Sequence, residues 1–296
     1  MLRIKAKNAK SKRALEEREP KAVENPKVTM LLRNSTANQV VTDILGDLAS
    51  LKKPLCKFFK RKDTFRPFEE DSKIEFLCQK NDASLFAIGQ HTKKRPNTIT
   101  MGRMFDFHIL DMFELSVDKY VPMEHCKMAV GSKPLMIFNG EEFEQKPDFK
   151  KLQNFLLDYF SGIKVNAINL AGLEVLISVT ALNGKIYFRV YNIALKKSGS
   201  RLPKVELKST GPSLDLVLGR VKEASPDVMK MALKRPAELK PKKIKNISHN
   251  PLGDKLGRVH VGKQDLTKLQ TRKMKGLKRT LSEKKAEKRQ KTETQD

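Results

Sequence analysis

The sequence has only three cysteines among its 296 residues, Cys56, Cys78 and Cys126. This odd number at wide spacing gives no disulfide framework and is typical of a reducing compartment. No two cysteines lie two residues apart, and no two histidines have the spacing of metal ligands on a helix, so we expect no metal site. A glycine-rich loop of phosphate-binding form is also missing, which argues against a nucleotide cofactor.

Long hydrophobic segments are absent too. The longest apolar runs, such as residues 175–179, are far shorter than the roughly 20 residues that cross a bilayer. No apolar stretch follows the first residues, so we expect no secretory signal and a soluble, intracellular protein.

Candidate catalytic groups are few. The acidic clusters at residues 69–71 and 141–144 have polar, turn-like surroundings, which favours solvated loops over a pair of nuclease carboxylates. His108, His125 and Cys126 could supply a nucleophile and a base, but nothing in the pattern supplies a third group to orient them. We therefore expect no catalytic residue.

Positive charge is abundant, and most of the excess lies at the two ends. The net charge is +26, of which +13 falls in residues 234–296 and +5 in residues 1–27. Basic arms of this kind neutralise phosphates and release counterions, so nucleic acid is the first partner to consider. The alternative is that the arms are solvated import signals, which suits a short cluster better than a tail of more than sixty residues.

The pattern divides the chain into three parts: a basic N-terminal arm (1–27), a folded domain (28–233) and a basic C-terminal tail (234–296). The domain is long enough to bury a core, as one large domain or as two fused lobes. Each half offers a helix and several strands, which predicts two α/β lobes at approximately 28–140 and 141–233. The fold class is α+β, with largely extended arms.

In the first half, apolar residues at helical spacing predict a helix from Val40 to Leu51, with Thr36 and Gln39 as a capping box. Strands are predicted at 74–79 and 84–89, and residues 98–117 are predicted to be mainly strand. The arm before them has a helical stretch around residues 9–19.

Further along the chain, a strand is predicted at 134–139, just before the second half, and a helix at 149–160 within it. Residues 174–182 and 185–195 are predicted to form a hairpin, whose Asn183-Gly184 suits a type I′ turn. Alternating residues from 205 to 218 indicate further strands, and a short helix at 226–233 closes the domain.

Two compact basic segments, residues 52–62 and 91–97, are expected in loops at the domain surface, where they would contact phosphate. Phe58 and Phe59 could stack on unpaired bases, but we favour core positions for both. Together with the tail, these segments supply the predicted RNA-binding residues: Lys52, Lys53, Lys57, Lys60, Arg61, Lys62, Lys93, Lys94, Arg95, Lys242, Lys243, Lys245, Arg272, Lys273, Lys275, Lys278 and Arg279.

The tail also carries apolar residues that a purely electrostatic tail would lack. Leu266, Leu269, Met274 and Leu277 are therefore predicted to dock on a partner, the tail ordering as it binds. The alternative is a permanently flexible linker. The terminal cluster at residues 284–291 is typical of a nuclear or nucleolar address.

Several segments resemble the Brix-domain family. They are SLF at 84–86, KKRPN at 93–97, GRM at 102–104, KPLMIF at 133–138, LAGLE at 170–174, TALNGKIYFR at 180–189 and GPSLDLVL at 211–218. In the tail, KKIKNISH at 242–249 and QDLTKLQTRKMKGLK at 264–278 resemble one member of the family in particular. The resemblance covers almost the whole length and is weakest at the extreme ends.

This resemblance implies a Brix domain of two similar halves, each like an anticodon-binding domain. It also implies a non-catalytic, nucleolar assembly factor for the large ribosomal subunit that supports pre-rRNA maturation. The implied partners are the regulator of ribosome synthesis protein, as a heterodimer, together with 5S ribosomal RNA, its bound ribosomal proteins and precursor large-subunit rRNA. Neither charge nor spacing establishes any of these partners.

Two other functions stay open at this point. An RNA-modifying or RNA-cleaving enzyme would need a cofactor loop or a cluster of carboxylates and metal, neither of which is found in the sequence. A structural ribosomal protein would share the basic, tailed composition of an assembly factor, and composition alone does not separate the two.

Overall fold

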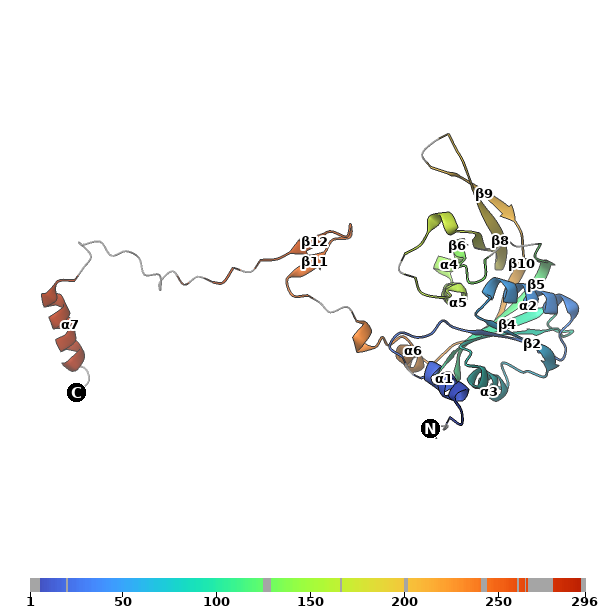
Figure 1. The fold of residues 1–296 in the computed structure, drawn as a ribbon, viewed down its shortest axis with the longest axis horizontal. Coiled ribbons are helices and arrows are strands. Elements are labelled where there is room, and N and C mark those ends of the chain that lie inside the picture. Colours follow the sequence, from blue (N-terminus) through green and yellow to red (C-terminus); the bar gives the residue numbers. More distant parts are fainter. Residues whose placement is uncertain are drawn as a thin grey trace. The chain divides into compact units, whose positions relative to one another are not determined.

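The computed structural model describes residues 6–19, 21–124, 129–165, 167–199, 202–240, 244–259, 261–263, 265 and 279–293. The chain divides into a unit of residues 1–240 and a unit of residues 241–296, each described by itself. In the first unit, helices pack against one large sheet (Figure 1). The α+β class predicted from the sequence is confirmed. No described helix is both long and apolar enough to span a membrane.

Nine strands of the sheet follow one another in the order β2-β1-β3-β4-β5-β10-β8-β7-β6, and β9 pairs with β8. Among these strands, the pairs β1–β2, β1–β3 and β6–β7 are parallel and the others antiparallel. Their bounds are β1 Thr29–Asn34, β2 Cys56–Asp63, β3 Leu85–Gln90, β4 Thr98–Phe105, β5 His108–Val121, β6 Leu135–Asn139, β7 Val175–Leu182, β8 Lys185–Lys196, β9 Lys204–Ser209 and β10 Ser213–Lys222.

In the first half, α2 (Gln39–Lys52) connects β1 to β2, and α3 (Ser72–Asn81) connects β2 to β3. The two helices cover opposite faces of the sheet, because α2 packs in the same apolar cluster as Leu31 and α3 packs with Met30 and Leu32. Since both faces of β1 and β3 are covered, these strands are buried almost along their whole length.

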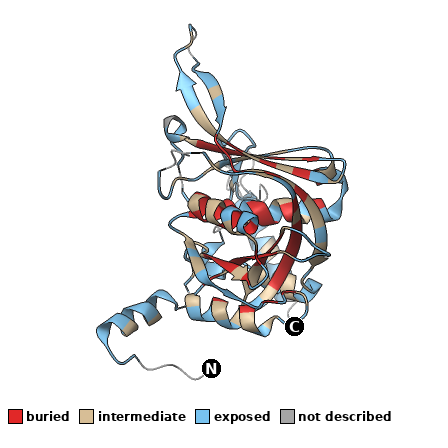
Figure 2. Cartoon of the chain, turned by 90° about the vertical axis from the view of Figure 1, so that its right-hand side faces the viewer, coloured by how far each residue is buried: buried red, intermediate tan, exposed pale blue. Residues whose placement is uncertain are grey.

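In the second half, α4 (Glu142–Gln145) and α5 (Pro147–Phe160) connect β6 to β7. α5 buries a stripe of six large side chains against the sheet: Phe149, Leu152, Phe155, Leu156, Tyr159 and Phe160. The Phe155 ring lies 5.2 Å from that of Phe113 on β5, so α5 packs on both halves. Figure 2 shows buried residues gathered along the sheet and on the helices beside it, whereas the β8–β9 hairpin is mostly exposed. The two halves therefore share one sheet and one main core.

The N-terminal arm contains the predicted helix, α1 (Ala9–Glu17), and the short helix α6 (Pro226–Ala232) follows β10. Single 3-10 turns occur at Leu170–Gly172 and Ala237–Leu239. In the second unit, β11 (Ile247–His249) pairs with β12 (Lys255–Gly257), and α7 spans Leu281–Glu293. The domain boundaries drawn from the sequence stay predictions.

Two local predictions are wrong. Residues 74–79 were expected to form a strand but belong to α3, where Ile74 and Cys78, one helical turn apart, face the core. The helix predicted from Val40 is present, but its cap is Asn38, whose side chain accepts a hydrogen bond from the Val41 amide at 3.0 Å. Thr36 is exposed and does not cap the helix.

The hairpin prediction is confirmed, because Asn183 and Gly184 both have positive φ, 53° and 75°. A second turn of the same kind was missed within the stretch predicted to be mainly strand. Asp106 and Phe107 have φ of 49° and 65° and separate β4 from β5.

Candidate nucleic-acid interface

β2, which carries most of the first basic segment, is the outermost strand at one end of the sheet. Leu31 of β1 pairs with Phe58, but Arg33 pairs with Lys62, so three residues of β2 stand opposite Leu32 alone. Lys60 and Arg61 lie in this bulge and are exposed at a sheet edge, and bulges commonly redirect side chains. The segment was expected to be a surface loop; residues 56–63 are instead a strand, and the four basic side chains Lys57, Lys60, Arg61 and Lys62 are exposed on it.

The two phenylalanines inside this basic strand pack inward. Phe58 lies against the cluster that contains α2, and Phe59 lies against the cluster that contains α3. Both are partly buried, and the guanidinium of Arg33 lies 5.6 Å from the centre of the Phe58 ring. The preference for core positions over base stacking is therefore confirmed.

The second basic segment is a loop, as predicted, between β3 and β4. Its ends are fixed by Asn97, whose side-chain oxygen accepts a hydrogen bond from Asn38 at 2.7 Å and whose amide donates to His91 Nδ1 at 3.2 Å. Lys93 and Lys94 project from this anchored loop and are exposed. Arg95 is also exposed, and its Nε lies 3.8 Å from the buried carboxylate of Glu114.

The two segments converge at the same edge of the sheet. β2 and β3 both run parallel to β1, so their carboxyl ends lie on either side of the carboxyl end of β1. Neighbouring strands are about 4.8 Å apart, so the two ends are separated by roughly 10 Å. We call the six cations gathered here, Lys60, Arg61, Lys62, Lys93, Lys94 and Arg95, the basic rim.

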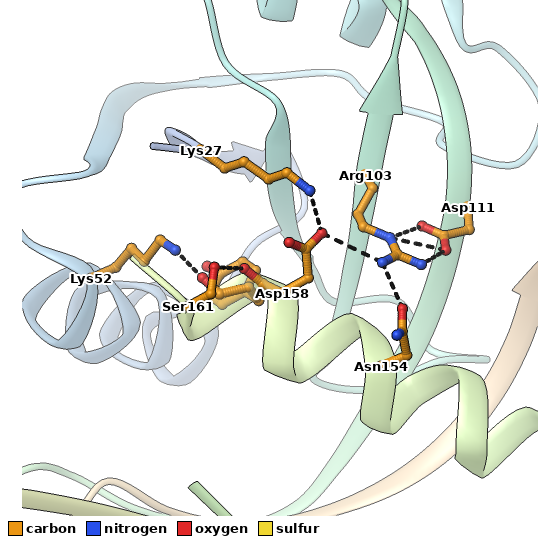
Figure 3. A network of polar contacts seen from close by, with 8 residues as sticks. Lys27, Lys52, Arg103, Asp111, Asn154, Asp158 and Ser161 are labelled. Carbon is orange, nitrogen blue, oxygen red and sulfur yellow. Dashed lines mark hydrogen bonds and ion pairs between the residues drawn. The ribbon is translucent and has the colours of Figure 1, made fainter. Parts of the chain in front are cut away.

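Lys52 does not belong to this surface. It lies in the last turn of α2, is 6% exposed, and its ammonium donates a hydrogen bond to the backbone oxygen of Tyr159 (Figure 3). Burial lowers its pKa from 10.5 to about 8, although the charge of Asp158 opposes this. Its ammonium is not available to a phosphate, so we withdraw Lys52 from the predicted RNA-binding set. Lys53, the next residue, is exposed.

A cleft of about 310 Å³ opens beside the basic rim, at the carboxyl ends of β1 and β3. Its lining includes Asn34 and Gln90 from these strand ends, together with Arg66, Arg95 and Arg220. Arg66, Gln90 and Arg220 were not predicted from the sequence, because the cleft joins residues far apart in the chain. For Gln90 the sequence did contain a signal. Asn34 and Gln90 are polar residues at the carboxyl ends of the two buried strands β1 and β3.

Residues 34–220 match the family described as the Brix domain. The chain belongs to the Brix-domain family. The "Ribosome production factor 2 homolog" of Homo sapiens is 50% identical over 257 residues, covering 86% of this chain and 84% of the relative. The "Ribosome biogenesis protein RPF2" of Saccharomyces cerevisiae is 43% identical over 290 residues, covering 93% and 84%. A structure titled as a probable ribosomal biogenesis protein from Aeropyrum pernix K1 shares 11% identity at a TM-score of 0.42, covering 64% of this chain and 96% of that one.

The matched Brix region contains the whole basic rim and ends at Arg220 in the cleft. The tail of this Brix-domain protein lies beyond the match. Lys245 and Arg279 are exposed there, and Arg279 forms an ion pair with Glu287 of α7. Other predicted tail residues lie outside the described part of the chain: Lys242, Lys243, Leu266, Leu269, Arg272, Lys273, Met274, Lys275, Leu277 and Lys278.

The described part of the Brix-domain protein contains no group of three or more His, Cys, Asp or Glu residues that could hold a metal ion. His108 contacts Glu75 at 3.2 Å, and His125 and Cys126 lie outside the described residues. In the acidic clusters, Asp71 forms an ion pair with Lys222, and Glu142 accepts hydrogen bonds from the Gly184 amide at 3.0 and 3.1 Å. Both carboxylates therefore have partners within the fold.

Proposed function

We propose that this protein is a non-catalytic assembly factor of the large ribosomal subunit that holds ribosomal RNA and places it for maturation. The observation that carries the proposal is the basic rim: six exposed cations from two separate segments, fixed on the edge of a rigid sheet. Relatives named as ribosome production and ribosome biogenesis factors support the assignment of this protein to ribosome assembly.

The rim and the tail supply different parts of this activity. Cations held on a strand and on an anchored loop at the same edge of the sheet fix an orientation relative to phosphates, because the fold sets their spacing. The tail, with its net charge of +13 over residues 234–296, supplies attraction over a longer range. Lys53, Lys57, Lys245 and Arg279 are exposed and extend the basic surface on each unit.

The finer assignment names the RNA and the protein partners. We propose that the RNA is 5S ribosomal RNA and precursor large-subunit rRNA, and that the protein helps recruit the 5S particle with its ribosomal proteins. The proposed protein partner is the regulator of ribosome synthesis protein, and the proposed location is the nucleolus. A docking surface for a protein is supported at β6, an outermost strand whose Leu135 and Ile137 are 41% and 40% exposed.

Crosslinking in cells, followed by sequencing of the bound RNA, tests the RNA assignment. Crosslinks are expected in 5S rRNA and in precursor large-subunit rRNA, with crosslinked peptides from residues 57–62 and 91–97. Crosslinks confined to messenger or transfer RNA would refute it.

Sedimentation separates the remaining alternatives. An assembly factor is expected in the precursor fractions and absent from polysomes, whereas a structural ribosomal protein would follow the polysomes. An RNA-processing enzyme would change or cut purified precursor RNA in a single-turnover assay, and no such change is expected.

A further inference from the structure

The strand order creates a topological switch point in the first half of the sheet. From β1 the chain crosses through α2 to β2 on one side, and then through α3 to β3 on the other side. The two crossover helices cover opposite faces, so the chain leaves a crevice between the carboxyl ends of β1 and β3. In open α/β sheets, ligands bind in such crevices.

The cleft of about 310 Å³ lies at this point. Its volume is within the range of about 300–1,000 Å³ that is typical of ligand pockets. The titratable groups of its lining are three arginines, Arg66, Arg95 and Arg220, and one glutamate, Glu69. Arg66 lies 3.6 Å from Glu69, and Glu114, which is not part of the lining, pairs with Arg95 and Arg220. These five groups leave one net positive charge, which favours a ligand with negative charge.

The floor of the cleft holds an unpartnered polar group. Gln90, the last residue of β3, is 8% exposed, and its side-chain oxygen accepts a long hydrogen bond from Asn34 Nδ2 at 3.4 Å. Within the described part of the chain, no atom accepts a hydrogen bond from the Gln90 side-chain NH₂. Gln90 lines the cleft, so this NH₂ group is free to donate to a ligand that offers a carbonyl or ring nitrogen.

The wall of the cleft contains a guanidinium held in a fixed plane. Arg220 donates to both carboxylate oxygens of Glu114, at 2.7 and 3.0 Å, and its guanidinium lies 4.0 Å from the centre of the Phe68 ring. With its charge matched by Glu114 and its position set by Phe68, Arg220 is prepared for stacking rather than for phosphate binding. Guanidinium planes are a common stacking surface for unpaired bases.

We propose that this cleft binds one unpaired nucleotide of the RNA that the basic rim holds. The base would enter beside Arg220 and accept a hydrogen bond from Gln90, and its phosphates would lie toward Arg66 and the rim. This inference rests on the proposed RNA-binding function and adds to it a preference for an unstacked base. Nucleic acid is favoured over an acidic peptide because the cleft opens next to the exposed Lys93 and Lys94 and offers a stacking group and a base-edge donor together.

The test compares two RNAs on the full-length protein: a blunt-ended duplex, and the same duplex with one bulged nucleotide. Wild type is expected to bind the bulged duplex about tenfold more tightly, since stacking of one base contributes roughly five- to 150-fold in affinity. Gln90→Met, of similar size, should reduce the preference to below about threefold while the affinity for the plain duplex stays unchanged. Gln79→Met, at an exposed position of α3, is the matched control.

A second variant tests whether a loss of the preference could come from a folding defect. Arg66→Gln changes a side chain that is 65% exposed, so the fold should be unaffected and the preference should again fall. If wild type binds both duplexes equally and retains its salt dependence, the cleft proposal is overturned and RNA binding stands. If wild type binds neither, the proposed function fails, and the cleft proposal fails with it. If Gln90→Met weakens binding of the partner protein and leaves the RNA preference intact, the cleft belongs to that protein and the proposal is overturned.

Discussion

Arg103 on β4 holds Asp158 on α5, with Nη1 lying 3.4 Å from the carboxylate (Figure 3). The same guanidinium donates through Nε to both oxygens of Asp111 on β5, at 2.9 and 3.1 Å, and through Nη1 to Asn154 of α5 at 3.0 Å. One side chain thus links two strands of the first half to the long helix of the second. Lys27, at the end of the N-terminal arm, completes the group with a 2.6 Å ion pair to Asp158.

The first prediction is that Arg103→Met strongly destabilises the protein. Asp111 is 4% exposed, and removing its partner leaves a buried carboxylate unpaired. Breaking a buried pair in this way lowers the free energy of unfolding by about 3–5 kcal/mol, which urea denaturation would measure. Lys185→Met is the control, because the Lys185–Asp118 pair is exposed and such pairs contribute about 0–1 kcal/mol. Similar losses in the two variants would show that Arg103 is not a structural link.

The second prediction concerns the pH dependence that Lys52 adds to stability. Because the folded-state pKa is about 8 and the ordinary value is 10.5, the unfolded chain binds a proton between these values that the folded chain does not. Stability due to Lys52 therefore rises with pH across this window, by up to about 1.4 kcal/mol per pH unit.

Lys52→Met removes this titration. The stability advantage of the Met variant over wild type should be largest at pH 7 and should shrink between pH 8 and pH 10, which urea unfolding at each pH measures. RNA affinity of the variant should match that of wild type. Parallel stability curves at all pH values would mean that the buried ammonium titrates normally.

Local patterns in the sequence were sufficient to predict those elements whose structure depends on neighbouring residues. The apolar spacing of α2 and α5 and the Asn183-Gly184 turn depend on neighbouring residues alone. α3 was mistaken for a strand because the short helix buries only Ile74 and Cys78, with Leu77 partly buried beside them, and a run of this length fits either period.

The site was harder to predict because it depends on long-range contacts. Lys52 stands in a basic run and looks like a surface residue, but its burial is decided by Tyr159, more than a hundred residues away. The bulge in β2 follows from its register with β1, and the cleft joins residues from Asn34 to Arg220. Periodicity in one segment contains none of this information.

The third prediction tests the basic rim by salt dependence. Replacing Lys60, Arg61, Lys93 and Lys94 with Gln should lower the slope of log affinity against log salt by about 2.8–3.6, if each contacts one phosphate. Arg95 is left in place, since its Nε lies 3.8 Å from the buried Glu114 and its removal could disturb the fold. Thermal unfolding should be nearly unchanged, because exposed substitutions shift stability by less than about 0.5 kcal/mol each.

A charge-matched control uses four exposed lysines of the second half, Lys150, Lys164, Lys197 and Lys208. Replacing these with Gln removes the same net charge but should change the slope much less. Equal changes in the two variants would show that RNA responds to total charge and that the rim is not a specific contact.

The fourth prediction separates charge from docking in the tail, where the four apolar residues lie outside the described part of the chain. Changing Leu266, Leu269, Met274 and Leu277 to Ser keeps every Lys and Arg, so affinity for generic RNA should be nearly unchanged. Each buried apolar side chain contributes about 1.5–3 kcal/mol, so residence on purified precursor particles should fall sharply. A variant without residues 241–296 should bind generic RNA more weakly and leave the particle faster, which sets the scale of each assay. If the Ser variant stays on the particle as long as wild type, the tail acts through its charge alone.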